Sequence, residues 1–260
     1  MSANPKTLPA SPLRNRVSKE EWETRVDLAA AYQLAHLFRW TDLIYTHFSA
    51  RVPGTDDMFI NPYGLMFDEI TASNLVKIDL EGNILDDSTG MGVNHAGFVI
   101  HGCVHEARAE INCVLHTHTR AGVAVSAHKC GLLPLSQHAM RVQSTITYHD
   151  YEGIALDMDE RTRMAADIGK TSRAMILRNH GLLTLGESVR EAFELMYYLD
   201  CACQIQVDAL AGGIDNALLM TESAARSAAG AFERPDRPSQ QKDWPALLRM
   251  LDRKGINYHE

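Results

Sequence analysis

Two histidine-bearing segments, each at the end of an apolar, strand-like run, constrain this chain more than any other feature. His116-Thr117-His118 follows the run 111–115, and His180 follows the run 174–177. Side chains at positions i and i+2 share one face of a strand, with Cα atoms roughly 6.5–7 Å apart, so two imidazoles can reach one ion. Three neutral nitrogens leave one coordination position open, as a catalytic metal requires. The sequence therefore predicts a metal centre on His116, His118 and His180.

Histidine pairs also arise by chance, because the chain contains 12 histidines. His101 and His105, spaced i, i+4 on a helical stretch, are such a pair, with no obvious carboxylate or third ligand nearby in the sequence. The setting distinguishes His116 and His118, because α/β folds place their chemistry at strand ends. We therefore assign a metal to His116 and His118 and none to the other pair.

Composition narrows the class of protein. A 260-residue chain with 45% hydrophobic and 22% charged residues is typical of a globular protein with a sizeable core. The net charge of −8, without a basic run, argues against nucleic acid as a partner. Five cysteines without a C-x-x-C motif favour reduced thiols. Residues 1–17 lack the apolar core of a signal peptide, and no apolar run approaches the ~20 residues that span a bilayer. We expect a cytoplasmic protein that is not bound to a membrane.

Periodicity and capping residues predict one layered α/β domain over residues 18–229. It lies between an extended N-terminal arm, 1–17, and a C-terminal tail, 230–260, which carries a short helix and is expected to fray at its end. Capping boxes at Ser18 and Ser188 open two long helices. The predicted helices are 18–38, 94–107, 188–210 and 244–251, and the main predicted strands are 45–52, 58–60, 76–80, 111–116, 170–179 and 182–185.

Several motifs together resemble the class II aldolase and adducin family over roughly residues 20–215. They are FINPYG (59–64), FVIH (98–101), VLHTHT (114–119), CGLLP (130–134), YHDY (148–151), ILRNHG (176–181) and GESV (186–189). The segments 130–134 and 148–151 are more similar to the adducin branch than to the sugar-phosphate aldolases.

This resemblance implies a three-layer α/β/α sandwich on a mainly antiparallel central sheet. It also implies zinc, or alternatively iron, manganese or cobalt, on the three histidines. Catalytic members use the metal as a Lewis acid that polarises a carbonyl and stabilises an enediolate during aldol cleavage, decarboxylation or epimerisation. A homo-oligomer is expected, with a tetramer favoured. The substrate-binding positions that the resemblance suggests are Asn61, Tyr63, Gly64 and Arg178. Arg178 would hold an anionic group of the substrate or pair with an acidic neighbour in the core.

The chain departs from the aldolase pattern at the acid/base and phosphate positions. The family's catalytic glutamate matches Gly97, and two phosphate-binding serines match approximately His95 and Ala96. A Gly-Asn phosphate-binding pair matches Thr46-His47, and a catalytic tyrosine falls near His138. These differences predict a small non-phosphorylated organic acid or keto compound as substrate.

Histidines at the altered positions are candidates for a replacement acid/base, because imidazole titrates near neutral pH. His95 is the first candidate, followed by His138 and His47, and the alternative for each is a packing or surface role. The leading hypothesis is a metal-dependent lyase or related carbonyl enzyme. A non-haem iron oxygenase on the same histidines and a non-catalytic, adducin-like binding or scaffold module are the alternatives. Adducin binds actin and spectrin through a long basic tail, which the residues after Lys254 do not supply.

Overall fold

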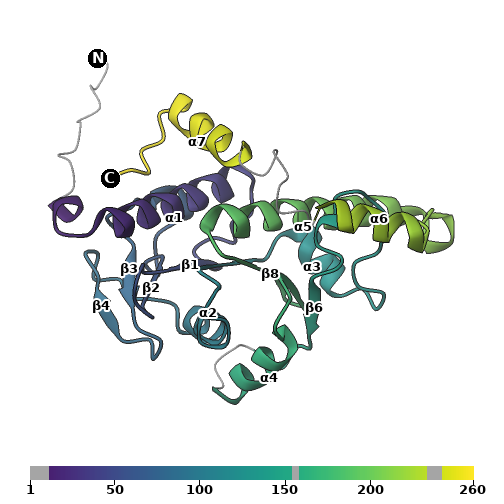
Figure 1. Ribbon diagram of the computed structural model, residues 1–260, viewed down its shortest axis with the longest axis horizontal. Coiled ribbons are helices and arrows are strands. Elements are labelled where there is room, and N and C mark those ends of the chain that lie inside the picture. The colour runs from purple at the N-terminus through teal and green to yellow at the C-terminus, as the bar shows by residue number, and fades with distance from the viewer. Residues whose placement is uncertain (1–11, 154–157, 233–241) are drawn as a thin grey trace.

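The computed structural model describes residues 12–153, 158–232 and 242–260, and a single mixed sheet forms its centre (Figure 1). The eight strands described there follow the order β4-β3-β2-β1-β5-β8-β7-β6. All neighbouring strands are antiparallel except β6 and β7. Their bounds are β1 His47–Arg51, β2 Met58–Ile60, β3 Val76–Ile78, β4 Ile84–Asp86, β5 Cys113–Thr117, β6 Ile146–His149, β7 Ala174–Leu177 and β8 Gly181–Gly186.

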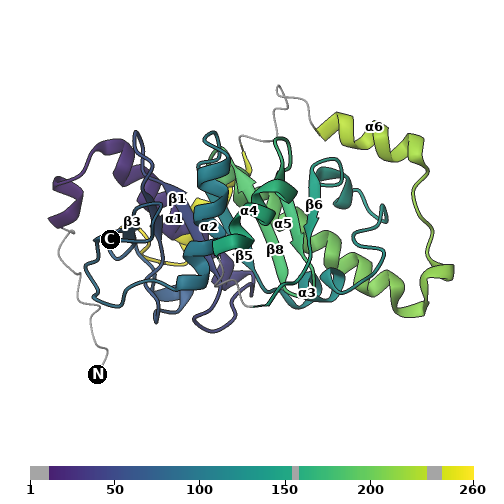
Figure 2. The same cartoon turned by 90° about the horizontal axis from the view of Figure 1, so that it is seen from below.

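Helices cover both faces of this sheet, so the molecule has three layers (Figures 1 and 2). Helices α1 and α5 lie on one face and α2 and α4 on the other. The α-helices are α1 Lys19–Leu37, α2 His95–Ala107, α3 Arg120–Ser126, α4 Met158–Ile168, α5 Val189–Ala209, α6 Glu222–Phe232 and α7 Asp243–Arg253. The predicted three-layer α/β/α sandwich with a mainly antiparallel sheet is confirmed.

The central strands are buried on both faces, which explains their continuous apolar sequences. In β5, Leu115 packs into the core beneath α1 and α5, whereas its neighbour Val114 packs into the core beneath α2 and α4. Alternate side chains of a strand point to opposite faces, so both cores draw on the same five-residue run. His116 therefore shares the face of Val114, on the α2 side of the sheet.

Local sequence signals predicted the two longest helices correctly. Ser18 accepts a hydrogen bond from the Glu21 amide at 3.0 Å at the start of α1. Ser188 accepts one from the Glu191 amide at 3.3 Å at the start of α5. Each cap satisfies an amide that has no partner within its helix. The predicted strand 170–179 is wrong in length, because the chain leaves α4 through Gly169, which has a φ of +58°, and β7 spans only Ala174–Leu177.

The first and last residues that the structure describes pack more closely than the sequence suggests. In the predicted arm, residues 1–11 lie outside the described residues, but 12–15 form a 3-10 helix and Leu13 is buried against Trp22. Tyr258 is also buried, so the prediction of a frayed C-terminus is wrong. The Ala72 amide donates to the Tyr258 carbonyl at 3.1 Å, and this backbone pairing fixes the last residues to the domain. In the part of the chain described, no helix is both long and apolar enough to cross a bilayer.

Candidate metal centre

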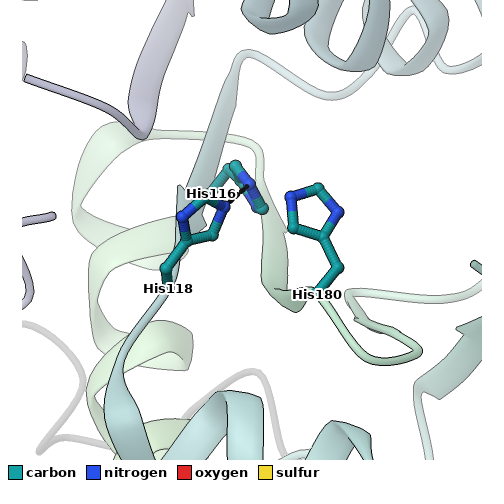
Figure 3. Close-up of side chains that lie close together, drawn as sticks. All are labelled: His116, His118 and His180. Atoms are coloured by element: carbon teal, nitrogen blue, oxygen red, sulfur yellow. Dashed lines mark hydrogen bonds between the residues drawn. The ribbon is translucent and has the colours of Figure 1, made fainter. Parts of the chain in front are cut away.

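His116, His118 and His180 come together at one end of the sheet, and their rings point toward a common space (Figure 3). One ligand nitrogen from each residue lies within 4.8 Å of those of the other two. His116 lies on β5, His118 follows that strand directly, and His180 occupies the turn between β7 and β8. Because β5 and β8 are paired neighbours, the sheet brings together histidines more than 60 residues apart in sequence.

The turn that carries His180 depends on its two neighbours. Asn179 has a φ of +55°, in the left-handed region that asparagine tolerates better than most residues. Gly181 lies directly against β5, since a Cβ atom there would lie 2.4 Å from the Thr117 carbonyl oxygen and 3.1 Å from Cδ2 of His118. The motif Asn179-His180-Gly181 therefore allows the turn to approach the other two histidines closely.

Hydrogen bonds to the outer ring nitrogens orient two of the histidines. Nδ1 of His116 lies 3.0 Å from the Leu182 carbonyl oxygen, and Nδ1 of His118 lies 2.9 Å from Oδ2 of Asp42. Both partners accept hydrogen bonds, so each neutral ring carries its proton on Nδ1 and has a lone pair on Nε2. Such outer partners commonly fix the orientation of metal-binding histidines.

The two lone pairs face each other. Nε2 of His116 and Nε2 of His118 are 2.9 Å apart, the contact drawn in Figure 3. When both rings are neutral with their protons on Nδ1, both Nε2 lone pairs are available, and one cation could bind both nitrogens. Burial lowers the pKa of His116 well below its usual value, with a smaller contribution from His180. Burial also lowers the pKa of His180 to about 4. Two of the three ligands, His116 and His180, are therefore neutral near pH 7, as binding of a transition metal requires.

Among the predicted acid/base histidines, His47 lies beside this centre. It is the cross-strand partner of His116, and the two ring centroids are 5.1 Å apart. Burial, followed by the neighbouring His118 and His180, lowers the pKa of His47 to about 3. A Cβ atom at Gly97 would lie only 2.7 Å from Cδ2 of His47. The ring of His47 thus borders the space that a side chain at position 97 would enter.

His95 and His138 make other contacts. His95 is the exposed first residue of α2, with its ring centroid 5.9 Å from that of Phe98. The His138 ring lies 5.8 Å from that of Tyr198 on α5. Neither contact joins these residues to the cluster of His116, His118 and His180, and the catalytic roles of His95 and His138 stay predictions.

The predicted substrate-binding residues occupy varied environments. Asn61 is buried, and its Oδ1 accepts a hydrogen bond from the Tyr32 hydroxyl at 2.8 Å, which is a contact of the core. Tyr63 is partly exposed at 38%, and Gly64 has a φ of +130°. The Arg178 guanidinium donates to the His128 carbonyl at 2.8 Å and lies 4.2 Å above the Tyr148 ring. Substrate binding by all four residues stays a prediction.

The sequence did not predict Asp42, nor that His149 and Glu160 line a small cavity beside His180. Asp42 lies 76 positions from His118 in an irregular segment, so no local pattern identifies it. The cavity, of about 10 Å³, is lined in part by His149, Glu160 and Arg178. Burial raises the pKa of Glu160. The YHDY motif at 148–151 supplies three of the residues that line this cavity, namely His149, Asp150 and Tyr151.

Sheet order, helical layers and a three-histidine cluster define a class II aldolase-type protein, and the chain belongs to the class II aldolase and adducin family. The family model described as "Class II Aldolase and Adducin N-terminal domain" matches residues 26–207.

The similar proteins include both aldolase-type proteins and an adducin. The crystal structure of an aldolase II superfamily protein from Pseudomonas syringae is 52% identical, with a TM-score of 0.92 over 96% of this chain and 100% of that one. L-fuculose 1-phosphate aldolase from Glaciozyma antarctica is 25% identical, with a TM-score of 0.80 over 93% of each chain. Mouse alpha-adducin is 45% identical over 91% of this chain, which corresponds to 34% of adducin.

Proposed function

We propose that this protein is a metal-dependent lyase or related carbonyl enzyme that acts on a small, non-phosphorylated organic acid or keto compound. Aldol cleavage, decarboxylation and epimerisation are the reactions within this class. The proposal depends on one observation above all: the Nε2 atoms of His116 and His118 lie 2.9 Å apart, with a ring nitrogen of His180 within 4.8 Å of them. Zinc held there, or alternatively iron, manganese or cobalt, would act as a Lewis acid toward a carbonyl group.

The chain's own residues would orient the substrate and move protons. His47, whose ring lies 5.1 Å from that of His116, is the candidate proton carrier beside the centre. Because burial lowers its pKa to about 3, it is a weak base and would take a proton only from a strongly acidified group. Arg178 lines the cavity beside His180 and supplies a positive charge for a carboxylate. Catalysis in this class needs such a proton carrier, and a positioned general acid or base typically contributes about 10²–10⁴-fold in rate.

Phosphorylated sugars are disfavoured by the same residues. The phosphate-binding Gly-Asn pair of the family corresponds to Thr46-His47. His47 is buried, and its Nδ1 lies 2.8 Å from Nε2 of His101, so this nitrogen is already occupied. The similarity to L-fuculose 1-phosphate aldolase supports aldolase-type chemistry, and the contact of His47 with His101 supports a substrate without phosphate at this position.

A non-catalytic binding module is the second candidate, and the 45% identity to mouse alpha-adducin favours it. The two candidates differ in what the metal is for. An enzyme loses turnover when its proton carrier is removed, whereas a scaffold has no turnover to lose.

The decisive experiment measures metal and turnover in the same samples. Elemental analysis of protein purified without added metal should give one transition-metal ion per chain, and His116→Ala with His118→Ala should abolish it. His36→Ala is a matched control, because His36 pairs with Asp68 at the surface at 3.7 Å. The metal-loaded protein is then screened with keto acids, hydroxy acids and phosphosugars, with and without oxygen.

Five outcomes are informative. Turnover of a non-phosphorylated keto or hydroxy acid supports the proposal. Efficient cleavage of a phosphosugar contradicts the substrate class, and oxygen-dependent turnover with bound iron indicates an oxygenase. Full metal content in the double variant refutes the metal site. A metal-loaded protein without turnover across the screen favours the binding module.

We also propose a homo-oligomer, with a tetramer favoured, in a reducing cytoplasmic environment. Support for assembly comes from large apolar side chains that are well exposed in the loops, including Leu43 at 66% and Met91 at 47%. The five cysteines are all free, which suits a reducing compartment. Sedimentation velocity at micromolar concentration tests the assembly, and a purely monomeric profile would contradict it.

A further inference from the structure

A chain of buried polar groups runs from the metal centre into the space between the sheet and α2. His47 and Ser49 lie on one face of β1, and His101 and His105 lie one turn apart on the facing side of α2. All four are buried, with at most 4% of each residue exposed. The far end of the chain is the backbone carbonyl of Ile111, 3.2 Å from Nδ1 of His105.

The members are linked one after another by hydrogen-bond distances. Nδ1 of His47 lies 2.8 Å from Nε2 of His101. Oγ of Ser49 lies 2.5 Å from Nδ1 of His101 and 2.8 Å from Nε2 of His105. Each ring nitrogen of His101 and His105 therefore has one hydrogen-bond partner. Once one nitrogen in the series is known to donate, the donor or acceptor role of every other nitrogen follows.

The Ile111 carbonyl sets the direction of the whole chain, because a carbonyl oxygen can only accept. His105 must then carry its proton on Nδ1, which leaves Nε2 as an acceptor. The Ser49 hydroxyl donates to that Nε2 and accepts from Nδ1–H of His101. Nε2 of His101 is consequently an acceptor, and it receives Nδ1–H of His47.

This assignment requires neutral rings with one proton each. Burial lowers the pKa of His105 to about 3, with a further contribution from the nearby Arg51. Burial also lowers the pKa of His101 well below its usual value, followed by the effects of His47 and His105. A second proton on either ring would have no acceptor within this series of hydrogen bonds. The hydrogen bonds and the burial therefore both require neutral rings.

We propose that Ser49, His101 and His105 are positioning residues that hold His47 as the Nδ1–H tautomer, with its Nε2 lone pair free beside the metal centre. Gly97 is part of the arrangement, because a Cβ atom there would lie 3.1 Å from Nε2 of His47 and would crowd that nitrogen. A free Nε2 is an acceptor for a substrate hydroxyl. That use rests on the proposed function, whereas the tautomer itself does not.

Nitrogen-15 NMR of the full-length protein labelled at histidine tests this proposal directly. Protonated and unprotonated imidazole nitrogens differ widely in chemical shift, and His47→Asn assigns the His47 signals by their loss. In the wild-type protein, Nδ1 of His47 should have the shift of a protonated nitrogen and Nε2 that of an unprotonated one. The reverse pattern, or an even mixture of tautomers, overturns the proposal without any variant.

Ser49→Ala tests whether the series of hydrogen bonds fixes the tautomer of His47. It removes the link between the two helical histidines, so the Nε2 signal of His47 should shift toward the protonated form. Ser49→Thr keeps the hydroxyl and should restore the wild-type shifts. Ser172→Ala is the matched control, because Ser172 is another buried serine whose hydroxyl bonds only to the Ile168 carbonyl of its own segment.

The result is separable from the test of function. Unchanged His47 shifts in folded Ser49→Ala protein would refute the positioning role even if the enzyme is active. The expected shifts in a protein without turnover would support the inference while the proposed function fails. If Ser49→Ala does not fold, the wild-type spectrum alone decides.

Discussion

Replacing Asp42 should weaken metal binding without changing the metal ligands. Oδ2 of Asp42 accepts a hydrogen bond from Nδ1 of His118 at 2.9 Å, and this bond keeps Nε2 of His118 unprotonated. In Asp42→Ala the ring is free to move its proton to Nε2, where the proton competes with the metal. Loss of an outer partner typically costs about 10–100-fold in metal affinity.

The structure places this site at the lower end of that range. The Asp42 side chain is 47% exposed, so water screens its charge and partly replaces its hydrogen bond. We therefore expect about a tenfold increase in Kd for zinc, or about 1.4 kcal/mol. Asp42→Asn keeps an acceptor oxygen and should have a smaller effect.

Competition with a chromophoric chelator at neutral pH measures these affinities. Asp68→Ala is a matched control, because Asp68 faces His36 at 3.7 Å and its side chain is 49% exposed. It should bind zinc like the wild-type protein. An Asp42→Ala protein with unchanged affinity would refute the reasoning, because His118 would then be oriented by something else.

Three further predictions concern stability. Acidification from pH 7 to 5 should lower the free energy of unfolding, because burial holds the pKa of His105 at about 3 in the folded protein, below the usual histidine value of 6.5. As the pH falls, the unfolded chain therefore binds the proton before the folded protein does. The free energy of unfolding decreases between pH 6.5 and pH 3, by up to about 1.4 kcal/mol per pH unit for such a residue. Urea titrations measure this, and a pH-independent midpoint would contradict it. Gly97→Ala should destabilise by about 1–3 kcal/mol, because the new Cβ would lie 2.7 Å from Cδ2 of His47; calorimetry giving an unchanged Tm would show that the ring moves freely. Tyr258→Ala should cost about 3–5 kcal/mol, since this side chain is 1% exposed. Tyr258→Phe should cost only about 1 kcal/mol for its hydrogen bond to Asp252, and equal losses in the two variants would contradict burial as the cause.

Features that depend on neighbouring residues were predictable from the sequence. Ser18 and Ser188 each cap a helix through an amide three positions away, so a four-residue pattern contains the whole interaction. The spacing of His116 and His118 is likewise local. Grouping His180 with this pair required the further inference that two apolar runs end at the same place in the fold. The pairing of β5 with β8 brings them together there.

Three features that depend on distant parts of the chain were not predicted. Strand β6 pairs in parallel with β7, and α4 lies between them in the chain. The short segment Ile146–His149 mixes polar and apolar residues and does not reveal this connection. Matching His138 to a family position gave its place in sequence but not the direction of its side chain, which lies against Tyr198. His47 was ranked last among the acid/base candidates, and only its pairing with β5 places it beside His116.

The spacing of the three histidines also determines how strongly a metal can stabilise the folded chain. His116 and His118 are two residues apart and remain close after unfolding, whereas His180 reaches them only through the pairing of β5 with β8. The denatured chain therefore keeps a weak two-nitrogen chelate, and a ligand stabilises a protein only by its preference for the native state. At high metal concentration both states become occupied, and the rise in Tm should level off. The plateau would measure the contribution of His180 alone, as the free energy of closing a loop of about sixty residues around an ion.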